Sequence, residues 1–306
     1  MTPVAALDCG TNSTRLLIVD DGGKPLDRRM RITRLGQGVD ATGVLRDDAI
    51  ERTLVVLREY RAAMDDHGVT DGRLAATSAA RDAANGASFL EAAAAVTGLR
   101  AELLSGEEEG RLSFAGATGD LDGPLGSLVV VDIGGGSTEL VTCVDDVVTA
   151  HSMQLGCVRL TERTMPGDPP DRASLAAAAS VVDLAIDAAF EAIPTLSVPD
   201  ATRRCVGLAG TVSTLAMIDL ALVDYDEAAV HHHWLSLEAI RAWRDTLASE
   251  SIDERRRRPG MVPGREDVIV AGAVILERVV DRLGVAGCLS SEHDILDGLA
   301  RSVLAR

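Results

Sequence analysis

Aromatic residues and lysine are scarce in this 306-residue sequence. Phe, Trp and Tyr together make up 2% of the residues, so a surface on which nucleic-acid bases stack is not expected. Lys24 is the single lysine, which excludes the lysine-containing phosphate loop of many nucleotide hydrolases. The net charge of −17 opposes nonspecific binding of DNA or RNA. We therefore expect a protein without a nucleic-acid partner.

Paired cysteines and long apolar runs are also missing. The five cysteines are scattered and lack CxxC spacing, which supports neither a zinc site nor a disulfide framework. No stretch approaches 18 consecutive apolar residues, and the chain leads directly into an apolar run from Val4 to Leu7. We therefore expect a cytoplasmic protein without a signal peptide and without a membrane partner.

Two nine-residue windows share one pattern. The windows from Asp8 to Leu16 (DCGTNSTRL) and from Asp132 to Leu140 (DIGGGSTEL) carry Asp, Gly, Ser, Thr and Leu at identical offsets. Each window lies between two apolar runs, which predicts a strand, a tight turn and a second strand. Backbone N–H groups of such a turn converge on an anion, and the Asp at the strand end can hold a cation or water. The residues expected to bind phosphate are Gly10, Thr11, Asn12, Ser13 and Thr14, and Gly134, Gly135, Gly136, Ser137 and Thr138.

The remaining sequence predicts two successive α/β units, with the boundary between residues 118 and 119. We place the first domain at 1–118 and the second at 119–306, with a terminal helix that can pack back on the first domain. The acidic, Gly-rich stretch 119–127 is the expected connection. Elements expected from periodicity and caps are strands at 31–35, 74–78, 101–104, 128–132, 205–208 and 287–290, and helices at 48–66, 88–97 (Ser88 as N-cap), 173–192 and 268–283.

Further segments appear in an order typical of one family. They are Thr33–Gly36, Ala76–Ala79 with Arg81 and Asn85, Ser105–Glu109, Gly207–Thr214 and Pro259–Gly272. With the two windows, they resemble the exopolyphosphatase and guanosine-pentaphosphate phosphohydrolase (Ppx/GppA) family in its short, two-domain form. This resemblance implies an α/β fold of two actin-like (ribonuclease H-like) domains, as in the actin, hexokinase and Hsp70 superfamily, with a phosphate-binding cleft between them. It also suggests a homodimer.

Hydrolysis of a phosphoanhydride needs a positioned water, neutralised phosphoryl oxygens and a stabilised leaving phosphate. Asp8, Asp132 and Glu139 are hard oxygen ligands of the kind that Mg²⁺ or another divalent cation prefers. Among Glu107, Glu108 and Glu109, the resemblance selects Glu109 as the catalytic base. It also implies that Glu139 orients water or metal.

Three groups of basic or glycine-rich residues extend the expected site. Arg81 resembles the family's phosphate-contacting arginine, and Arg34 and Arg265 are weaker candidates of the same kind. Gly210 and Thr211 are expected to line the phosphate site, the alternative being close packing of a strand against a helix. The run Arg255–Arg258 is either a solvated helix end or a guide for a polyphosphate tail.

The run His231–His233 is interpreted as a non-metal feature. Consecutive histidines on one element cannot all face one ion, and no carboxylate is spaced along the sequence to help them.

The resemblance implies a Mg²⁺-assisted exopolyphosphatase that releases terminal orthophosphate from inorganic polyphosphate. The acidic composition favours short chains, because a long polyanion would lie against a repelling surface. Hydrolysis of guanosine pentaphosphate (pppGpp) is the nearest alternative. A small-molecule kinase leaves Glu109 without a role, and a non-catalytic phosphate or nucleotide sensor gains nothing from Glu109 and Glu139 beside phosphates that repel them.

Overall fold

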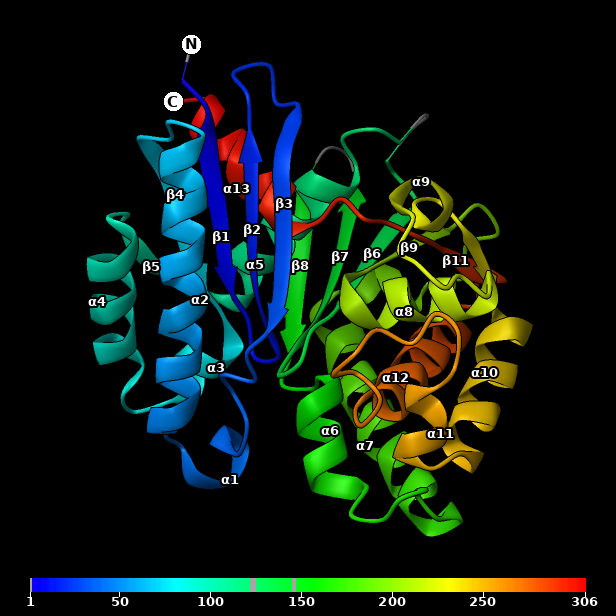
Figure 1. Cartoon of the computed structure of the whole chain (residues 1–306). Helices are drawn as coiled ribbons and strands as arrows, with labels where there is room; N and C mark the ends of the chain where they lie inside the picture. Colours follow the sequence, from blue (N-terminus) through cyan, green and yellow to red (C-terminus); the bar gives the residue numbers. More distant parts are fainter. Residues whose placement is uncertain (1, 122–124, 145–146) are drawn as a thin grey trace. The chain divides into compact units, whose positions relative to one another are not determined.

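The computed structural model describes residues 2–121, 125–144 and 147–306, which form two compact units (Figure 1). Unit 1 comprises residues 1–119 and 294–306, and unit 2 comprises residues 120–293. The last helix therefore belongs to the unit that begins the chain. Within the expected connection 119–127, residues 122–124 lie outside the described residues.

Unit 1 is built on a five-stranded mixed sheet with the strand order β3-β2-β1-β4-β5. Strands β1 to β3 pair in an antiparallel way, whereas β4 and β5 run parallel to β1. Its elements are β1 (Val4–Cys9), β2 (Ser13–Val19), β3 (Pro25–Ile32), α1 (Val39–Thr42), α2 (Asp47–Asp66), β4 (Asp71–Ala76), α3 (Ser78–Asp82), α4 (Gly86–Thr97), β5 (Ala101–Leu103), α5 (Gly106–Ala117) and α13 (Ile295–Leu304).

Alternation along β1 gives the sheet two apolar faces. Ala5, Leu7 and Cys9 pack in one core cluster with residues of α2 and α4, whereas Val4 and Ala6 pack in another with residues of α13. Successive side chains of a strand point to opposite faces. Asp8 therefore lies on the same face of the sheet as Val4 and Ala6, which α13 covers. Figure 1 shows α13 packed on this sheet.

Three predictions of element boundaries in unit 1 are wrong. The strand expected at 74–78 is β4, which ends at Ala76, and Ser78 begins α3. The third strand begins at Pro25 and ends at Ile32, so residues 33–35 form the exit from the strand rather than a strand of their own. Helix α4 begins at Gly86 with Asn85 as N-cap, and Ser88 lies inside it. The Asn85 side chain caps no helix, because its amide binds the N–H and carbonyl groups of Leu45 (2.8 and 2.9 Å).

Unit 2 contains a six-stranded mixed sheet with the strand order β10-β11-β9-β6-β7-β8. Strands β6 to β8 pair in an antiparallel way, and β9 and β11 continue the sheet in parallel. Its elements are β6 (Leu128–Ile133), β7 (Thr138–Val144), β8 (Val147–Met153), α6 (Cys157–Thr164), α7 (Arg172–Ala192), a 3₁₀ turn (Pro194–Ser197), β9 (Arg204–Leu208), α8 (Ala209–Asp219), α9 (Glu227–Val230), β10 (Trp234–Ser236), α10 (Leu237–Ser249), α11 (Ile252–Arg256), α12 (Ile269–Arg282) and β11 (Gly287–Ser290).

The two sheets repeat one topology. In each, a hairpin and a third antiparallel strand (β1-β2-β3 and β6-β7-β8) are followed by parallel strands added beside the first strand (β4-β5 and β9-β11). Strand β10 extends only the second sheet. The predicted α/β fold class of two actin-like domains is confirmed by this repeat.

Helix α7 has the length and mean hydropathy (1.6) of a membrane-spanning helix, which no uninterrupted apolar run had indicated. Its apolar composition comes largely from alanines, and Ala178, Val182 and Ile186 are buried in the core of unit 2. Asp183 pairs with Arg278 of α12 (2.8 Å), and Asp187 pairs with Arg282 of the same helix. Because charges midway along a helix are costly in a bilayer, we interpret α7 as an amphipathic helix that packs on unit 2 through one face.

Replacement of Gly116 on α5 tests the close packing of α5 against α13. A Cβ at this position would lie 1.8 Å from the backbone oxygen of Asp294, so Gly116→Ala forces the helices apart. We expect a loss of about 1–3 kcal/mol in unfolding free energy, measured by urea denaturation. Gly126→Ala is the control, because nothing lies within 4 Å of its Cβ. Equal stability of the two variants would contradict the prediction.

Candidate active site

The two repeated windows form the same strand–turn–strand structure. Gly10 donates its N–H to the Ser13 carbonyl (3.0 Å), and Gly134 donates to the Ser137 carbonyl at the same distance. The residues pair across the hairpins at equal offsets, with Asp8 opposite Arg15 and Asp132 opposite Glu139. The sequence repeat is therefore a structural repeat, with one turn in each unit.

The first turn is fixed from outside by the chain that leaves β3. Thr33 and Arg34 donate their N–H groups to the Asn12 carbonyl (3.0 and 2.9 Å), and Gly36 donates to the Thr11 carbonyl (2.9 Å). A Cβ on Gly36 would lie 2.4 Å from the Thr11 side chain, so only glycine permits this approach. Arg34, a weaker candidate from sequence, contributes its backbone to this support and adopts a left-handed φ of 50°.

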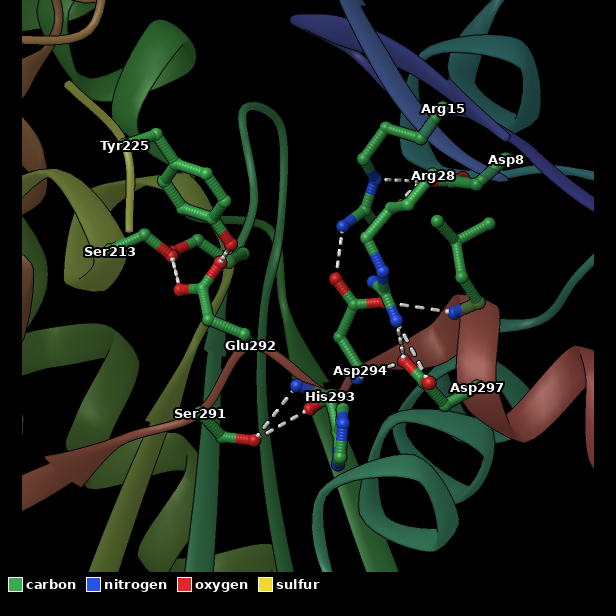
Figure 2. A network of polar contacts seen from close by, with 12 residues as sticks. Asp8, Arg15, Arg28, Ser213, Tyr225, Ser291, Glu292, His293, Asp294 and Asp297 are labelled. Carbon is green, nitrogen blue, oxygen red and sulfur yellow. Dashed lines mark hydrogen bonds and ion pairs between the residues drawn. The ribbon is translucent and has the colours of Figure 1, made fainter. Parts of the chain in front are cut away.

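Asp8, at the end of β1, is held by an arginine on the neighbouring strand (Figure 2). Arg15 Nε and Nη2 donate to Asp8 Oδ2 (3.0 and 2.7 Å), and Arg15 Nη1 binds Asp294, the N-cap of α13. Asp8 Oδ1 is buried and has no hydrogen-bond partner among the described residues. Burial raises the pKa of Asp8, and Arg15 opposes that shift. A cation at Oδ1 would offset the cost of burying this carboxylate.

Asp294 was missed by sequence reasoning, although its position carries a recognisable signal. Its side chain accepts the N–H of Leu296 (2.9 Å), and its own N–H donates to Asp297 three residues later (3.0 Å). This reciprocal arrangement is a capping box, which an acidic residue three positions before another predicts at a helix start. Arg28 of β3 then binds both carboxylate oxygens of Asp297 (2.8 Å each), as Figure 2 shows.

Glu109 and Arg81, predicted from distant segments, meet in unit 1. Glu109 lies in the first turn of α5 and is buried, and Arg81 lies on α3. Arg81 Nη1 donates to Glu109 Oε2 (3.2 Å) and to the carbonyl of Leu104 (2.8 Å). Arg81 Nη2 is buried without a hydrogen-bond partner among the described residues. This guanidinium therefore orients Glu109 with one nitrogen and retains the other for an anion.

Glu107 and Glu108 differ from Glu109 in their surroundings. Glu107 is exposed and forms a long ion pair with Arg111 (3.6 Å). Glu108 donates its N–H to the N-cap Ser105 (3.1 Å) and pairs with Arg73 at 3.4 Å. Both behave as solvated carboxylates at a helix N-terminus, where the helix dipole favours them.

The second turn packs closely against the start of α6. Gly134 has no left-handed φ, so this residue does not need the conformational freedom of glycine. A Cβ on Gly156 would lie 2.3 Å from the backbone of Gly135, so only glycine permits this approach of α6. The N–H groups of Cys157 and Val158 donate to the carbonyls of Gly134 (3.0 Å) and Gly135 (2.9 Å).

Asp132 and Glu139 are a cross-strand pair of buried carboxylates on one face of the second sheet. Glu139 Oε1 accepts a hydrogen bond from Ser152 of β8 (2.7 Å). Two neighbouring carboxylates repel each other unless a cation or proton lies between them, and oxygen ligands of this kind suit Mg²⁺. The Asp132–Glu139 pair of unit 2 and, separately, the Asp8 carboxylate of unit 1 each have oxygen ligands that fit a divalent cation.

Gly210 and Thr211 begin α8, which follows β9 directly. A Cβ on Gly210 would lie 1.6 Å from the Arg265 guanidinium, and a Cβ on Gly272 would lie 2.4 Å from Thr211 Oγ1. These contacts join α8 to the segment 265–272, whereas the alternative left open by the sequence was packing of a strand against a helix. Because β9 pairs with β6, with Leu208 opposite Asp132, the same packing also brings Gly210 to the end of the sheet that carries the second turn.

The run Arg255–Arg258 is largely neutralised. Arg255 is buried and binds Asp168 (2.6 Å), Arg256 pairs with Asp253 (2.7 Å), and Arg258 pairs with Glu250. These arginines hold α11 and the loop after it in place, so they are not the open basic track that a polyphosphate guide requires.

The bridge between Asp8 and Asp294 predicts a large loss of stability when Arg15 is removed. Arg15→Ala leaves two buried carboxylates without this cation, and we expect the free energy of unfolding to fall by about 3–5 kcal/mol. The matched control is Arg58→Ala, which removes an exposed pair with Glu51 and should cost less than about 1 kcal/mol. Urea denaturation of both variants without divalent cations checks this difference, and similar losses would contradict it.

Comparisons with known proteins agree with this geometry. The family model of the Ppx/GppA phosphatase family matches residues 17–302. Exopolyphosphatase 2 of Mycobacterium tuberculosis is 40% identical, over 99% of this chain and 99% of its own. The crystal structure of an exopolyphosphatase-like protein superposes with a TM-score of 0.92 at 37% identity, over 100% of this chain and 99% of that one.

A Ppx/GppA family member from Aquifex aeolicus is similar along the whole chain as well. It superposes with a TM-score of 0.80 at 33% identity and covers 99% of this chain and 98% of its own. The chain belongs to the Ppx/GppA phosphatase family.

Proposed function

We propose that this phosphoanhydride hydrolase is an exopolyphosphatase, which releases terminal orthophosphate from inorganic polyphosphate. The observation that carries the proposal is the arrangement of Arg81, whose Nη1 binds Glu109 while its buried Nη2 has no hydrogen-bond partner among the described residues. A guanidinium in this state can bind a phosphoryl oxygen beside a carboxylate base. The identity with a named exopolyphosphatase over the whole chain supports the choice of substrate.

In the proposed reaction, Glu109 accepts a proton from a water molecule, and the water oxygen attacks the terminal phosphorus. The new P–O bond forms as the anhydride P–O bond opposite it breaks, and the shortened polyphosphate leaves with the bridging oxygen. Arg81 Nη2 donates to a non-bridging oxygen of the transferred group, whose negative charge it stabilises. Glu109 returns its proton to the medium or to the products.

Two further buried donors are suited to phosphate. Asn12 Nδ2 in the first turn and Thr138 Oγ1 in the second have no hydrogen-bond partner among the described residues. A buried donor without a partner costs about 1–3 kcal/mol, which a phosphate oxygen would recover. We propose that each of the two turns, Gly10–Thr14 and Gly134–Thr138, binds a phosphoryl group, and that Gly210 and Thr211 line the site in unit 2.

Asp8, Asp132 and Glu139 are the residues proposed to hold a divalent cation. When bound, Mg²⁺ supplies neutralising charge to phosphate oxygens. Glu139 is fixed by Ser152, so it can also orient a water molecule without changing its own position. Mg²⁺ dependence, the homodimer and the cytoplasmic location expected from the sequence stay predictions.

Glu109→Gln tests the base. The amide keeps the size of the side chain and removes the proton acceptor, so kcat should fall by about 10²–10⁴-fold while KM changes little. Glu107→Gln, on the same helix turn and exposed, should keep kcat close to that of the wild type. Orthophosphate release under saturating polyphosphate gives both values. Full activity of Glu109→Gln would reject this residue as the base.

We also propose a preference for short chains. The net charge of −17 repels a long polyanion, and arginines of the run Arg255–Arg258 are engaged with carboxylates. Release per chain end should fall as polyphosphate lengthens at low salt, and fall less in 0.5 M salt, where screening acts over about 3–10 Å. Release that rises steadily with chain length would contradict the preference.

The substrate assignment is tested by orthophosphate release with Mg²⁺ from short polyphosphate, long polyphosphate, guanosine pentaphosphate and ATP. The proposal expects the fastest release from polyphosphate, lost in Glu109→Gln. Faster release from guanosine pentaphosphate would assign the protein to the other activity that the family name describes. No release from any of the four would reject an enzymatic role and favour a phosphate or nucleotide sensor.

A further inference from the structure

Four side chains that the proposed reaction does not use meet in unit 2. Asp120 is the first residue of this unit, and His293 is its last, directly after β11 and Ser291–Glu292. His231 and His232 follow α9. Ligand atoms of Asp120, His231 and His293 all lie within 4.8 Å of one another, and His232 Nε2 lies 4.0 Å from Asp120 Oδ2.

His231 fixes the carboxylate of Asp120. Its Nδ1 accepts the N–H of Glu292 (3.1 Å), so its proton is on Nε2, which lies 2.7 Å from Asp120 Oδ2. The neighbouring residue Glu292 is itself anchored by Ser213 (2.6 Å) and Tyr225 (2.5 Å), as Figure 2 shows. Both Asp120 and the ring that binds it are therefore held in one orientation.

Nitrogens of the other two histidines face the same carboxylate. His293 Nδ1 lies 3.1 Å from Asp120 Oδ2, and His232 Nε2 lies 4.0 Å from it. Both nitrogens are buried, and neither makes a hydrogen bond among the described residues. A neutral imidazole whose lone pair faces a carboxylate is repelled by it, whereas a cation between them would attract both. The carboxylate of Asp120 and the two imidazole nitrogens that face it are therefore placed as ligands of a cation would be.

The backbone of His232 is the second indication. It has a left-handed φ of 62°, which is uncommon for a residue with a side chain, and its N–H is tied to the Ser290 carbonyl (2.7 Å). This conformation turns the ring onto His231, with the ring centroids 3.9 Å apart. The next residue, His233, points elsewhere and binds Asp219 (2.7 Å). The histidine run is thus divided between two carboxylates that are distant in sequence.

We propose that Asp120, His232 and His293 bind a divalent transition-metal ion such as Zn²⁺, and that His231 is the residue that orients Asp120. Imidazole nitrogen and carboxylate oxygen are ligands that such ions prefer, whereas Mg²⁺ prefers oxygen alone. Two ligands of a tetrahedral zinc lie about 3.3 Å apart. The His293–Asp120 distance already matches this separation, and the His232–Asp120 distance exceeds it by roughly 0.7 Å.

The three ligand side chains are partly exposed, so a water molecule can occupy the fourth coordination position of the ion. Because Asp120 and His293 are the first and last residues of unit 2, the ion would hold the two ends of this unit together. That role is independent of the proposed hydrolysis. The earlier interpretation of the histidine run as a non-metal feature depended on the lack of a nearby carboxylate in the sequence, and the fold supplies one.

The experiment is a titration of untagged, chelator-treated full-length protein with Zn²⁺ in the absence of substrate, followed by calorimetry. A parallel titration with Co²⁺ is followed by its visible absorption. We expect one equivalent of Zn²⁺ per chain and an affinity at least tenfold lower in Asp120→Asn and in His293→Gln. The control His233→Gln should bind Zn²⁺ like the wild type, since its ring faces Asp219.

Three results would overturn the proposal. They are no saturable Zn²⁺ binding by the wild type, wild-type affinity in both Asp120→Asn and His293→Gln, and displacement of Zn²⁺ by excess Mg²⁺. Circular dichroism identifies a variant that fails to fold, and the other ligand variant then decides the outcome. Because no substrate is present, an error in the proposed reaction leaves this result unaffected.

Discussion

The guanidinium of Arg15 is the group on which the geometry of the candidate site residues in unit 1 depends. It joins Asp8, at the end of β1, to Asp294, the first residue of the chain's return to unit 1. Helix α13, which Asp294 caps, packs in turn on α5, where a Cβ on Gly116 or Gly298 would collide with the facing backbone. Since α5 carries Glu109, the final helix fixes both the proposed cation ligand and the proposed base.

The duplicated hairpins diverge at one informative position. Seven residues after the aspartate, the first hairpin has Arg15 and the second has Glu139, and each lies opposite its own aspartate. The first pair is an ion pair that leaves one oxygen of Asp8 unpartnered among the described residues. The second is a pair of carboxylates, which attracts a cation. The first hairpin therefore carries a paired carboxylate, and the second carries two carboxylates opposite each other.

The local features of the site could be predicted from the sequence. Five matched residues predicted both turns, because these signals operate within a few residues. Predicted element boundaries were wrong where tertiary contacts compete with local capping signals. At the start of α4, the Asn85 side chain binds Leu45 instead of capping the helix. The sequence analysis placed the third strand at 31–35 instead of Pro25–Ile32, because the half-exposed polar residues of this strand lack a clear apolar alternation.

Long-range pairings could not be predicted in the same way. Nothing in the spacing relates Asp120 to His231 or Arg15 to Asp294, since these contacts depend on how β11 and the chain after it are placed within each unit. The arginines at 255–258 could not be assigned either, because their carboxylate partners include Asp168, which is far away in the sequence. The sequence shows which residue types could form such contacts, but it does not show which of these residues are neighbours in the structure.

The most direct test of the central claim is a crystal structure of the Glu109→Gln variant with Mn²⁺ and tripolyphosphate. The account predicts anomalous density for Mn²⁺ beside Asp8 Oδ1 and a terminal phosphate oxygen within hydrogen-bond distance of Arg81 Nη2. A phosphate bound elsewhere, with Arg81 Nη2 and Asn12 Nδ2 still without partners, would contradict the assignment of these residues to substrate binding.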